Sequence, residues 1–222
     1  MPMFMMPQPR LFAEVFCAIQ GEGSLAGVPA VFLIADDAPL RPMWCREQRG
    51  KWKPDEGLAL GSLVAAVRRC WYDYAVIAGG EPLTLPELDK ITDRLRRFDH
   101  HVTVETPATV YAEMPCDLMS ISIELGTAPA AGKKGKKTSK SGLAHDPKVL
   151  RQLVEKYPYQ IKFYCNDPAE IPEIKRIVED CGAKRSNVFL IAGAAKPKDR
   201  DAQMEWLNEL SRVQGYRLGA RV

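Results

Sequence analysis

The sequence predicts an α/β fold in which parallel strands alternate with helices. Short apolar runs of strand length, such as 74–78 and 188–192, are separated by segments whose apolar residues recur at helical spacing. Strands that alternate with helices favour parallel pairing with right-handed crossovers. The chain holds about six such units, too few for a closed eightfold barrel of about 250 residues. A partial barrel and a doubly wound sheet both remain open.

Each expected element has a local signal. Strands are expected where apolar residues run together or alternate with polar ones, at 11–19, 28–34, 74–78, 101–105, 117–123, 159–164 and 188–192. Helices are expected around the periodic apolar positions of 63–67, 88–98, 149–154, 171–181 and 204–210. Ser62 is a candidate N-cap for the first helix, and Asp167 followed by Pro168 marks the start of the fourth.

The composition is that of an ordinary globular domain. Of 222 residues, 46% are hydrophobic and 27% are charged, with 31 basic against 28 acidic side chains. This small positive charge does not favour nucleic acid or a membrane as partner, and no apolar run reaches the roughly 18 residues of a membrane span. We expect one domain over 1–222 with a flexible Lys-rich loop at 128–142. Because no aromatic residues interleave with its lysines, a solvated insertion is favoured over an RNA clamp.

The cysteine pattern indicates a reduced, cytoplasmic protein. Residues 1–10 lack the basic and apolar regions of a signal peptide. A domain of this size does not need disulfides, and no two cysteines form a C-x-x-C pair. The six cysteines are scattered singly, at Cys17, Cys45, Cys70, Cys116, Cys165 and Cys181.

Glycines and carboxylates follow several of the predicted strands. In a parallel α/β fold, ligands collect at the carboxyl ends of the strands, and glycines there let a ligand approach the backbone. These strand ends carry Gln20-Gly21-Glu22-Gly23, Gly79-Gly80-Glu81-Pro82, Glu105-Thr106, Ser120 and Ser122. They predict a small-molecule site, with plain turns as the alternative for each glycine pair. The chain has no H-E-x-x-H, G-x-S-x-G or Walker motif that would name the chemistry.

Several segments, taken in order, carry a family resemblance. They read EVFCAIQGEG at 14–23, GVPAVF at 27–32, GGEP at 79–82, VET at 104–106, DLMSIS at 117–122, YQIKF at 159–163 and GYR at 215–217. Together they resemble 7-carboxy-7-deazaguanine synthase, a radical S-adenosylmethionine enzyme of queuosine and 7-deazaguanine biosynthesis. The resemblance implies a partial (βα)6-type radical-SAM barrel, modified and C-terminally shortened, and a homodimer.

The resemblance also implies cofactors and site residues. The cofactors are S-adenosylmethionine, a [4Fe–4S] cluster and Mg²⁺, and the substrate is a purine- or pterin-like molecule. The substrate-binding candidates are Gln20, Gly21, Glu22, Gly23 and Gly80. The cofactor-binding candidates are Gly79, Glu81, Glu105, Ser120 and Ser122.

The cluster-binding positions depart from the family pattern. The family holds its cluster with three cysteines spaced C-x3-C-x2-C after the second strand. An alignment without a gap places Ala38, Pro42 and Cys45 at these positions. Cluster irons need soft thiolates, which Ala38 and Pro42 lack, so Cys45 is the single metal-ligand candidate that remains.

Other polar positions of the family motifs are also replaced. An arginine associated with the substrate carboxylate is matched by Ile34, and a threonine before the glycine pair by Ala78. Further replacements are Arg46-Glu47 for an Asp-Thr pair whose threonine lies near magnesium, Ser122-Ile123-Glu124 for Ser-Pro-Lys, Ile191-Ala192-Gly193-Ala194 for Met-Pro-Glu-Gly, and Gly219-Ala220 for Cys-Pro. Apolar scaffold positions are kept while polar site positions change.

We therefore expect a homologue that is inactive in radical chemistry and still binds a purine-like or adenosyl ligand. One alternative is an active synthase that converts 6-carboxy-tetrahydropterin by ring contraction, with Cys17 completing the cluster; strand alternation, however, places Cys17 in the core. A second alternative is a non-enzymatic partner that dimerises with an active relative or contacts RNA through the lysines of 133–140.

Overall fold

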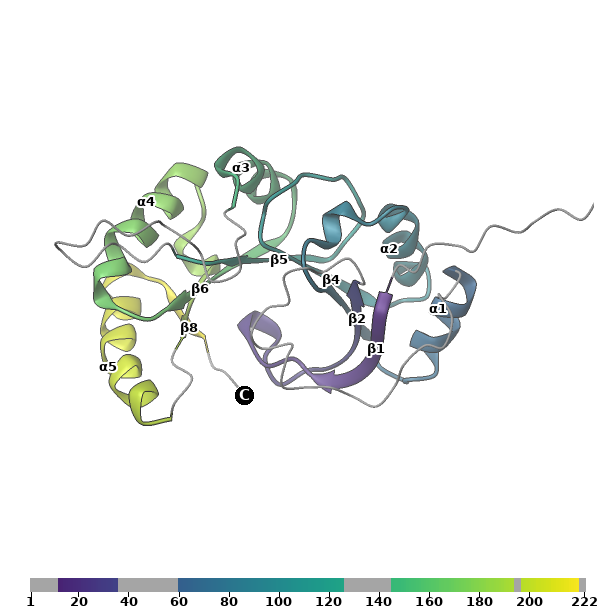
Figure 1. Ribbon diagram of the computed structural model, residues 1–222, viewed down its shortest axis with the longest axis horizontal. Helices are drawn as coiled ribbons and strands as arrows, with labels where there is room; N and C mark the ends of the chain where they lie inside the picture. Colours follow the sequence, from purple (N-terminus) through teal and green to yellow (C-terminus); the bar gives the residue numbers. More distant parts are fainter. Residues whose placement is uncertain (1–11, 36–59, 126–144, 194–196, 220–222) are drawn as a thin grey trace, which may run out of the picture.

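A single mixed sheet organises the described part of the chain (Figure 1). The computed structural model describes residues 12–35, 60–125, 145–193 and 197–219. The strands are β1 (Phe12–Ile19), β2 (Pro29–Ala35), β3 (Tyr74–Ala78), β4 (His101–Thr106), β5 (Leu118–Ile123), β6 (Tyr159–Cys165), β7 (Val188–Ala192) and β8 (Arg217–Gly219). They neighbour one another in chain order, and every pair from β2 to β8 is parallel. The predicted α/β class is confirmed, and the absence of an order reversal in this sheet excludes a doubly wound arrangement.

Helices cover the convex side of the curved sheet, as Figure 1 shows. They are α1 (Leu60–Arg68), α2 (Leu88–Arg96), α3 (Pro147–Lys156), α4 (Ile171–Cys181) and α5 (Pro197–Gln214). Short 3-10 turns are η1 (Gly23–Leu25), η3 (Pro82–Thr84), η4 (Pro168–Glu170) and η5 (Arg185–Asn187). Asp167 caps η4 with a full capping box, which leads directly into α4 as its sequence predicts. Ser62 lies inside α1, so the predicted cap at that position is wrong.

The two faces of the sheet carry different clusters of buried side chains. The larger core joins outward residues such as Leu33, Ile77 and Ile161 to buried helix residues such as Leu95 and Leu153. The smaller cluster contains strand residues alone and lies on the opposite, inward face: Ala30, Phe32, Ile34, Val76 and Ala78. Because side chains alternate along a strand, this division fixes which residues of every strand face inward.

The first strand departs from the predicted parallel pattern. β1 pairs antiparallel with β2, with Ile19 opposite Pro29. The connection between these strands spans only 20–28, too short for the crossover that a parallel pair requires. Between β4 and β5, residues 107–117 form no helix either. The predicted alternation of strands and helices is therefore wrong at these two connections, while the predicted parallel pairing is confirmed from β2 to β8.

None of the helices in the described ranges is long and apolar enough to cross a membrane. The Lys-rich segment 128–142 and the cluster positions Ala38, Pro42 and Cys45 lie outside the described residues.

Candidate functional site

The inward face of the sheet is apolar on one half and polar on the other. Apolar side chains of β1 to β3 form the first half, at Phe16, Ala18, Ala30, Phe32, Ile34, Tyr74, Val76 and Ala78. Polar side chains of β4 to β6 form the second, at Thr103, Glu105, Ser120, Ser122, Gln160, Lys162 and Tyr164. Interiors of parallel barrels are normally filled by branched apolar side chains. The polar half of the inward face is therefore the candidate site.

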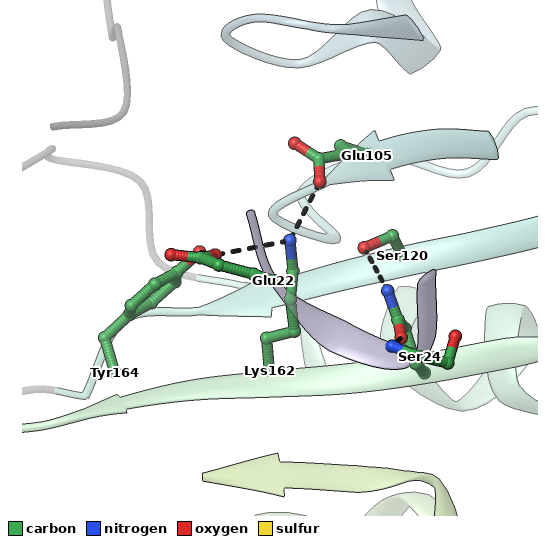
Figure 2. A network of polar contacts seen from close by, with 7 residues as sticks. Glu22, Ser24, Glu105, Ser120, Lys162 and Tyr164 are labelled. Atoms are coloured by element: carbon green, nitrogen blue, oxygen red, sulfur yellow. Dashed lines mark hydrogen bonds and ion pairs between the residues drawn. The ribbon is translucent and has the colours of Figure 1, made fainter. Parts of the chain in front are cut away.

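Lys162 is the charged centre of this site. Its side chain is 2% exposed, and its Nζ lies 2.8 Å from Glu105 Oε1 and 3.8 Å from Glu22 Oε2 (Figure 2). Burial alone lowers the pKa of a lysine, but the neighbouring carboxylates outweigh it, so the pKa of Lys162 is raised. The ammonium stays charged and joins two glutamates that are far apart in the sequence.

Tyr164 completes the support of Glu22. The Tyr164 hydroxyl donates to Glu22 Oε2 at 2.6 Å, the oxygen that also faces Lys162. Burial raises the pKa of Tyr164, so the phenol keeps its proton and remains a donor at neutral pH. Figure 2 shows Glu22 held between the two side chains of β6.

A second polar contact fixes the turn that carries Glu22. Gln160 Oε1 accepts from the Ser24 amide at 2.8 Å, and Gln160 Nε2 donates to Ser120 Oγ at 2.9 Å. Gln160 and Ser120 are both buried, so the hydrogen bond between them is made where water cannot replace it, whereas the bond to the Ser24 amide is partly buried. Gln160 thus ties the turn between β1 and β2 to the middle of the sheet.

The position of this turn corrects the sequence-based expectation. Because β1 is antiparallel, Gln20-Gly21-Glu22-Gly23 lies at the amino end of β2, and not among the carboxyl ends of the parallel strands. The turn reaches across the inward face to β6, and Figure 1 shows it on the concave side of the sheet. Glu22 nevertheless meets Glu105, which is near the carboxyl end of β4, because Lys162 bridges them.

Gly23 and Gly27 of this turn differ in how much space surrounds them. Gly23 and Gly27 both have positive φ, at +79° and +89°, so alanine is strained at either position. At Gly27 a new Cβ meets nothing within 4 Å, whereas at Gly23 it lies 2.5 Å from Gln160 Nε2. Gln160 can move away only by giving up its bonds to Ser24 and Ser120.

We expect Gly27→Ala to lower the free energy of unfolding by about 1–2 kcal/mol, the cost of the backbone conformation. Gly23→Ala should cost about 1–3 kcal/mol more, because it also displaces Gln160. Urea denaturation of the two variants measures the difference. Equal losses would show that Gln160 does not hold the turn.

The glycine-carboxylate turn after β3 is organised around Glu81. Its carboxylate accepts from the Leu83 amide at 3.2 Å, from Thr106 Oγ1 at 2.8 Å and from Thr109 Oγ1 at 2.6 Å. Glu81 therefore joins the loop after β3 to the loop after β4. Gly79 and Gly80, which precede Glu81 in the first of these loops, both have positive φ. A Cβ at Gly79 would lie 2.9 Å from Ile34, which shows how closely this loop approaches β2.

Two predicted site residues have buried polar atoms without a partner. Gln20 is 7% exposed, and its Nε2 has no hydrogen-bond partner among the described residues. The same is true of the buried Ser122 Oγ, which lies on the inward face next to Lys162 in the strand register. Buried polar groups are nearly always paired, so such atoms indicate a place for a ligand or ordered water.

The structure brings some predicted residues together and separates others. Glu22 and Glu105 meet at Lys162, and Ser122 lies beside it. Ser120 is fully buried and bonded to Gln160, while Glu81 with Gly79 and Gly80 forms a separate loop at the end of β3.

Sequence reasoning missed Gln160, Lys162 and Tyr164 as site residues. The available signal was their spacing, because polar residues at every second position of a strand share one face. A lysine between Ile161 and Phe163 in a strand with both faces covered must find an acidic partner.

The described cysteines do not form a cluster site. Cys116, Cys165 and Cys181 are buried in the outward core, as expected of free cysteines, and burial raises the pKa of Cys116 and Cys165 to about 12. Cluster irons require thiolates, which this burial disfavours. Cys17 is exposed, so its expected place in the core is wrong; it lies on β1, the first strand in the order of the sheet, and interacts with Cys70. No group of three His, Cys, Asp or Glu side chains in the described ranges could hold a metal ion.

Two of the replaced family positions lie in the apolar half of the inward face. Ile34 and Ala78 are opposite each other in the β2–β3 register and are 1% and 0% exposed. They pack with Phe32, whose ring stacks on Phe16 with centroids 5.3 Å apart. Ile34, Ala78, Phe32 and Phe16 offer no side-chain cation or hydroxyl to a ligand.

Comparisons with known structures agree with the class of fold that the sheet and its covering helices define, an α/β partial barrel. Over the fold, the chain matches the crystal structure of QueE from Escherichia coli with a TM-score of 0.62 at 19% identity, covering 94% of this chain and 92% of that one. It also matches Streptococcus suis SuiB bound to S-adenosylmethionine, with a TM-score of 0.53 at 13% identity, covering 82% of this chain and 47% of that one.

Sequence relatives specify the family. The 7-carboxy-7-deazaguanine synthase of Halobacterium salinarum is 30% identical, over 94% of this chain and 87% of its own length. That of Rhodopirellula baltica is 30% identical, over 93% of this chain and 82% of its own. No family model matches the sequence. The chain belongs to the 7-carboxy-7-deazaguanine synthase family, as its motifs predict.

Proposed function

We propose that this chain binds a purine-like or adenosyl ligand on its inward face and does not carry out the radical reaction of its family. The observation that carries the proposal is the donor set at the cluster positions, which read Ala38, Pro42 and Cys45. One thiolate cannot hold a cluster whose irons need soft sulfur ligands. The residues present therefore do not fit a [4Fe–4S] cluster.

No other donors in the described ranges compensate for this loss. Cys116, Cys165 and Cys181 are buried in the outward core, on the opposite face from the site. Cys17 and Cys70 interact with each other and also lie on the outward side of the sheet. The threonine that the family resemblance places near magnesium is matched by Glu47, which exchanges a neutral hydroxyl for a carboxylate. The loss of two sulfur ligands supports a protein that no longer uses the cluster.

The inward polar residues support retained binding. Lys162 and its two glutamates form a buried charged group, which is costly unless it serves a purpose. Gln20 Nε2 and Ser122 Oγ supply unpaired hydrogen-bonding atoms on the same side of the sheet. A heterocycle with ring nitrogens and exocyclic amines would satisfy these donors and the carboxylates.

Anaerobic reconstitution tests the loss of radical chemistry, and calorimetric titration tests the retained ligand binding. The purified chain is incubated with iron and sulfide, its iron is counted, and 5′-deoxyadenosine release from S-adenosylmethionine is assayed beside the Halobacterium salinarum relative. We expect less than about one iron per chain and no release, against about four irons in the relative. Calorimetric titration with adenosine and guanine should detect binding. About four irons with 5′-deoxyadenosine release would instead make the chain an active synthase.

A further inference from the structure

Two free cysteines of the described ranges meet on the outward side of the sheet. Cys17 lies on β1, directly opposite Val31 of β2, whose side chain belongs to the outward core. Residues that lie opposite each other in an antiparallel pair share one face, so Cys17 faces outward as well. Cys70 follows the end of α1 and packs against the same core. The two side chains are joined there by a hydrogen bond.

The hydrogen bonds of the two thiols distinguish a donor from an acceptor. Cys70 Sγ donates its proton to the Ala66 carbonyl of α1, at 3.7 Å, which leaves Cys17 as the donor to Cys70. Partial burial of the Cys17 sulfur, and next this hydrogen bond, raise the pKa of Cys17 to about 12. Cys17 therefore keeps its proton, and a first nucleophilic attack falls to Cys70.

Reagents in solution can reach this pair. Cys17 is exposed and Cys70 is partly exposed, whereas the other cysteines in the described ranges, Cys116, Cys165 and Cys181, are buried. Thiol–disulfide exchange requires access to the sulfur, so it is favoured at the first two positions and disfavoured at the other three.

We propose that Cys17 and Cys70 form a reversible disulfide that fastens β1 to the end of α1. The proposal goes beyond the proposed function and does not depend on it. The oxidant is a small disulfide such as glutathione disulfide. The Cys70 thiolate attacks one sulfur of the oxidant and releases the first glutathione thiol. Cys17 then loses its proton, and its sulfur attacks the Cys70 sulfur and displaces the second glutathione thiol. The two cysteines lose two electrons and two protons, and the two glutathione thiols receive them.

The disulfide would close residues 17–70 into a loop. This loop contains the turn 20–28, which carries Glu22 across the inward face, and the cluster positions 38, 42 and 45. Among the described strands, β1 pairs only with β2, so the disulfide adds a second attachment for this strand. Because closing a long loop restricts the unfolded chain, we expect oxidation to raise the melting temperature by at least about 5 °C.

Oxidation of the purified full chain tests the pairing. The chain is equilibrated in glutathione buffers of increasing disulfide content, its free thiols are blocked with iodoacetamide, and the unreduced digest is analysed by mass spectrometry. We expect a link between Cys17 and Cys70 that dithiothreitol removes, together with the rise in melting temperature. Cys45→Ser is the matched control, since it removes a cysteine from the same loop and should leave the link and the rise unchanged.

Single substitutions test the order of the two steps. Cys17→Ser should hold one glutathione on Cys70, because the second thiol that releases it is missing, and its melting temperature should not rise by this amount. Cys70→Ser should take up less glutathione at Cys17 in the same buffer, because the protonated thiol is a poor nucleophile. Glutathione on both cysteines of the wild type without a link between them would overturn the proposal. A link of either cysteine to a different partner, or a wild type that stays unmodified at both, would overturn it as well.

Discussion

Replacing Lys162 with methionine should lower the free energy of unfolding by about 3–5 kcal/mol. Methionine fills a similar volume, so the loss comes from charge and not from a cavity. Glu105, which is 17% exposed and whose Oε1 lies 2.8 Å from Lys162 Nζ, would stay largely buried without this cation, and an uncompensated buried charge is strongly destabilising. At about 2–4 °C per kcal/mol for a chain of this size, the melting temperature should fall by about 10 °C.

A surface lysine provides the matched control. Lys90 pairs with Glu87 at 2.6 Å, but the two side chains are 60% and 54% exposed. Lys90→Met should therefore cost less than about 1 kcal/mol. Adding Glu105→Gln to Lys162→Met should recover part of the loss, because the Glu105 carboxylate that has lost Lys162 is removed. A loss of less than about 1 kcal/mol for Lys162→Met would contradict the buried ion pair.

The pH dependence of this effect follows from the raised pKa of Lys162. A raised pKa in the folded state stabilises the protein fully below the unfolded value of about 10.5, and this stabilisation is lost as the pH rises above it. The difference in unfolding free energy between the wild type and Lys162→Met should therefore be constant from pH 7 to 9. Urea denaturation across this range measures it. A difference that shrinks below pH 9 would mean that the ammonium loses its proton on folding.

The individual elements could be predicted because their signals are local. The bounds of β3 and β7 agree with their apolar runs, Tyr74–Ala78 and Val188–Ala192, and the cap at Asp167 follows from its own side chain and the proline after it. The three residues of β8 were missed, because a strand that short contains too little alternation to be recognised.

The site could be predicted only in part, because its geometry depends on pairing between distant strands. Gln20 to Gly23 were placed at the carboxyl edge on the assumption that β1 is parallel, and the short connection to β2 reverses that placement. Glu22 and Glu105 were both predicted from their places beside strand ends, and the structure brings both to Lys162. No local signal says which acidic residues a buried lysine will meet.

Restoring the two missing cysteines should restore iron binding. We expect the wild-type chain to retain less than about one iron after anaerobic reconstitution, and Ala38→Cys with Pro42→Cys to retain about four, because three thiolates at the family spacing suffice to hold the cluster. Iron analysis and visible absorption measure the difference. The matched control adds Cys45→Ser to the double variant, which keeps both new thiols and removes the third, so its iron content should fall back toward the wild-type value.

Activity should not return with the iron. Ile34 and Glu124 stand where the family resemblance implies an arginine and a lysine, and Ile34 is buried in an apolar wall that offers a substrate carboxylate no partner. The reconstituted double variant should therefore remain far less active on 6-carboxy-tetrahydropterin than the Halobacterium salinarum relative. A colourless double variant would contradict the assignment of positions 38 and 42. Full activity would instead show that two cysteines alone separate this chain from an active synthase.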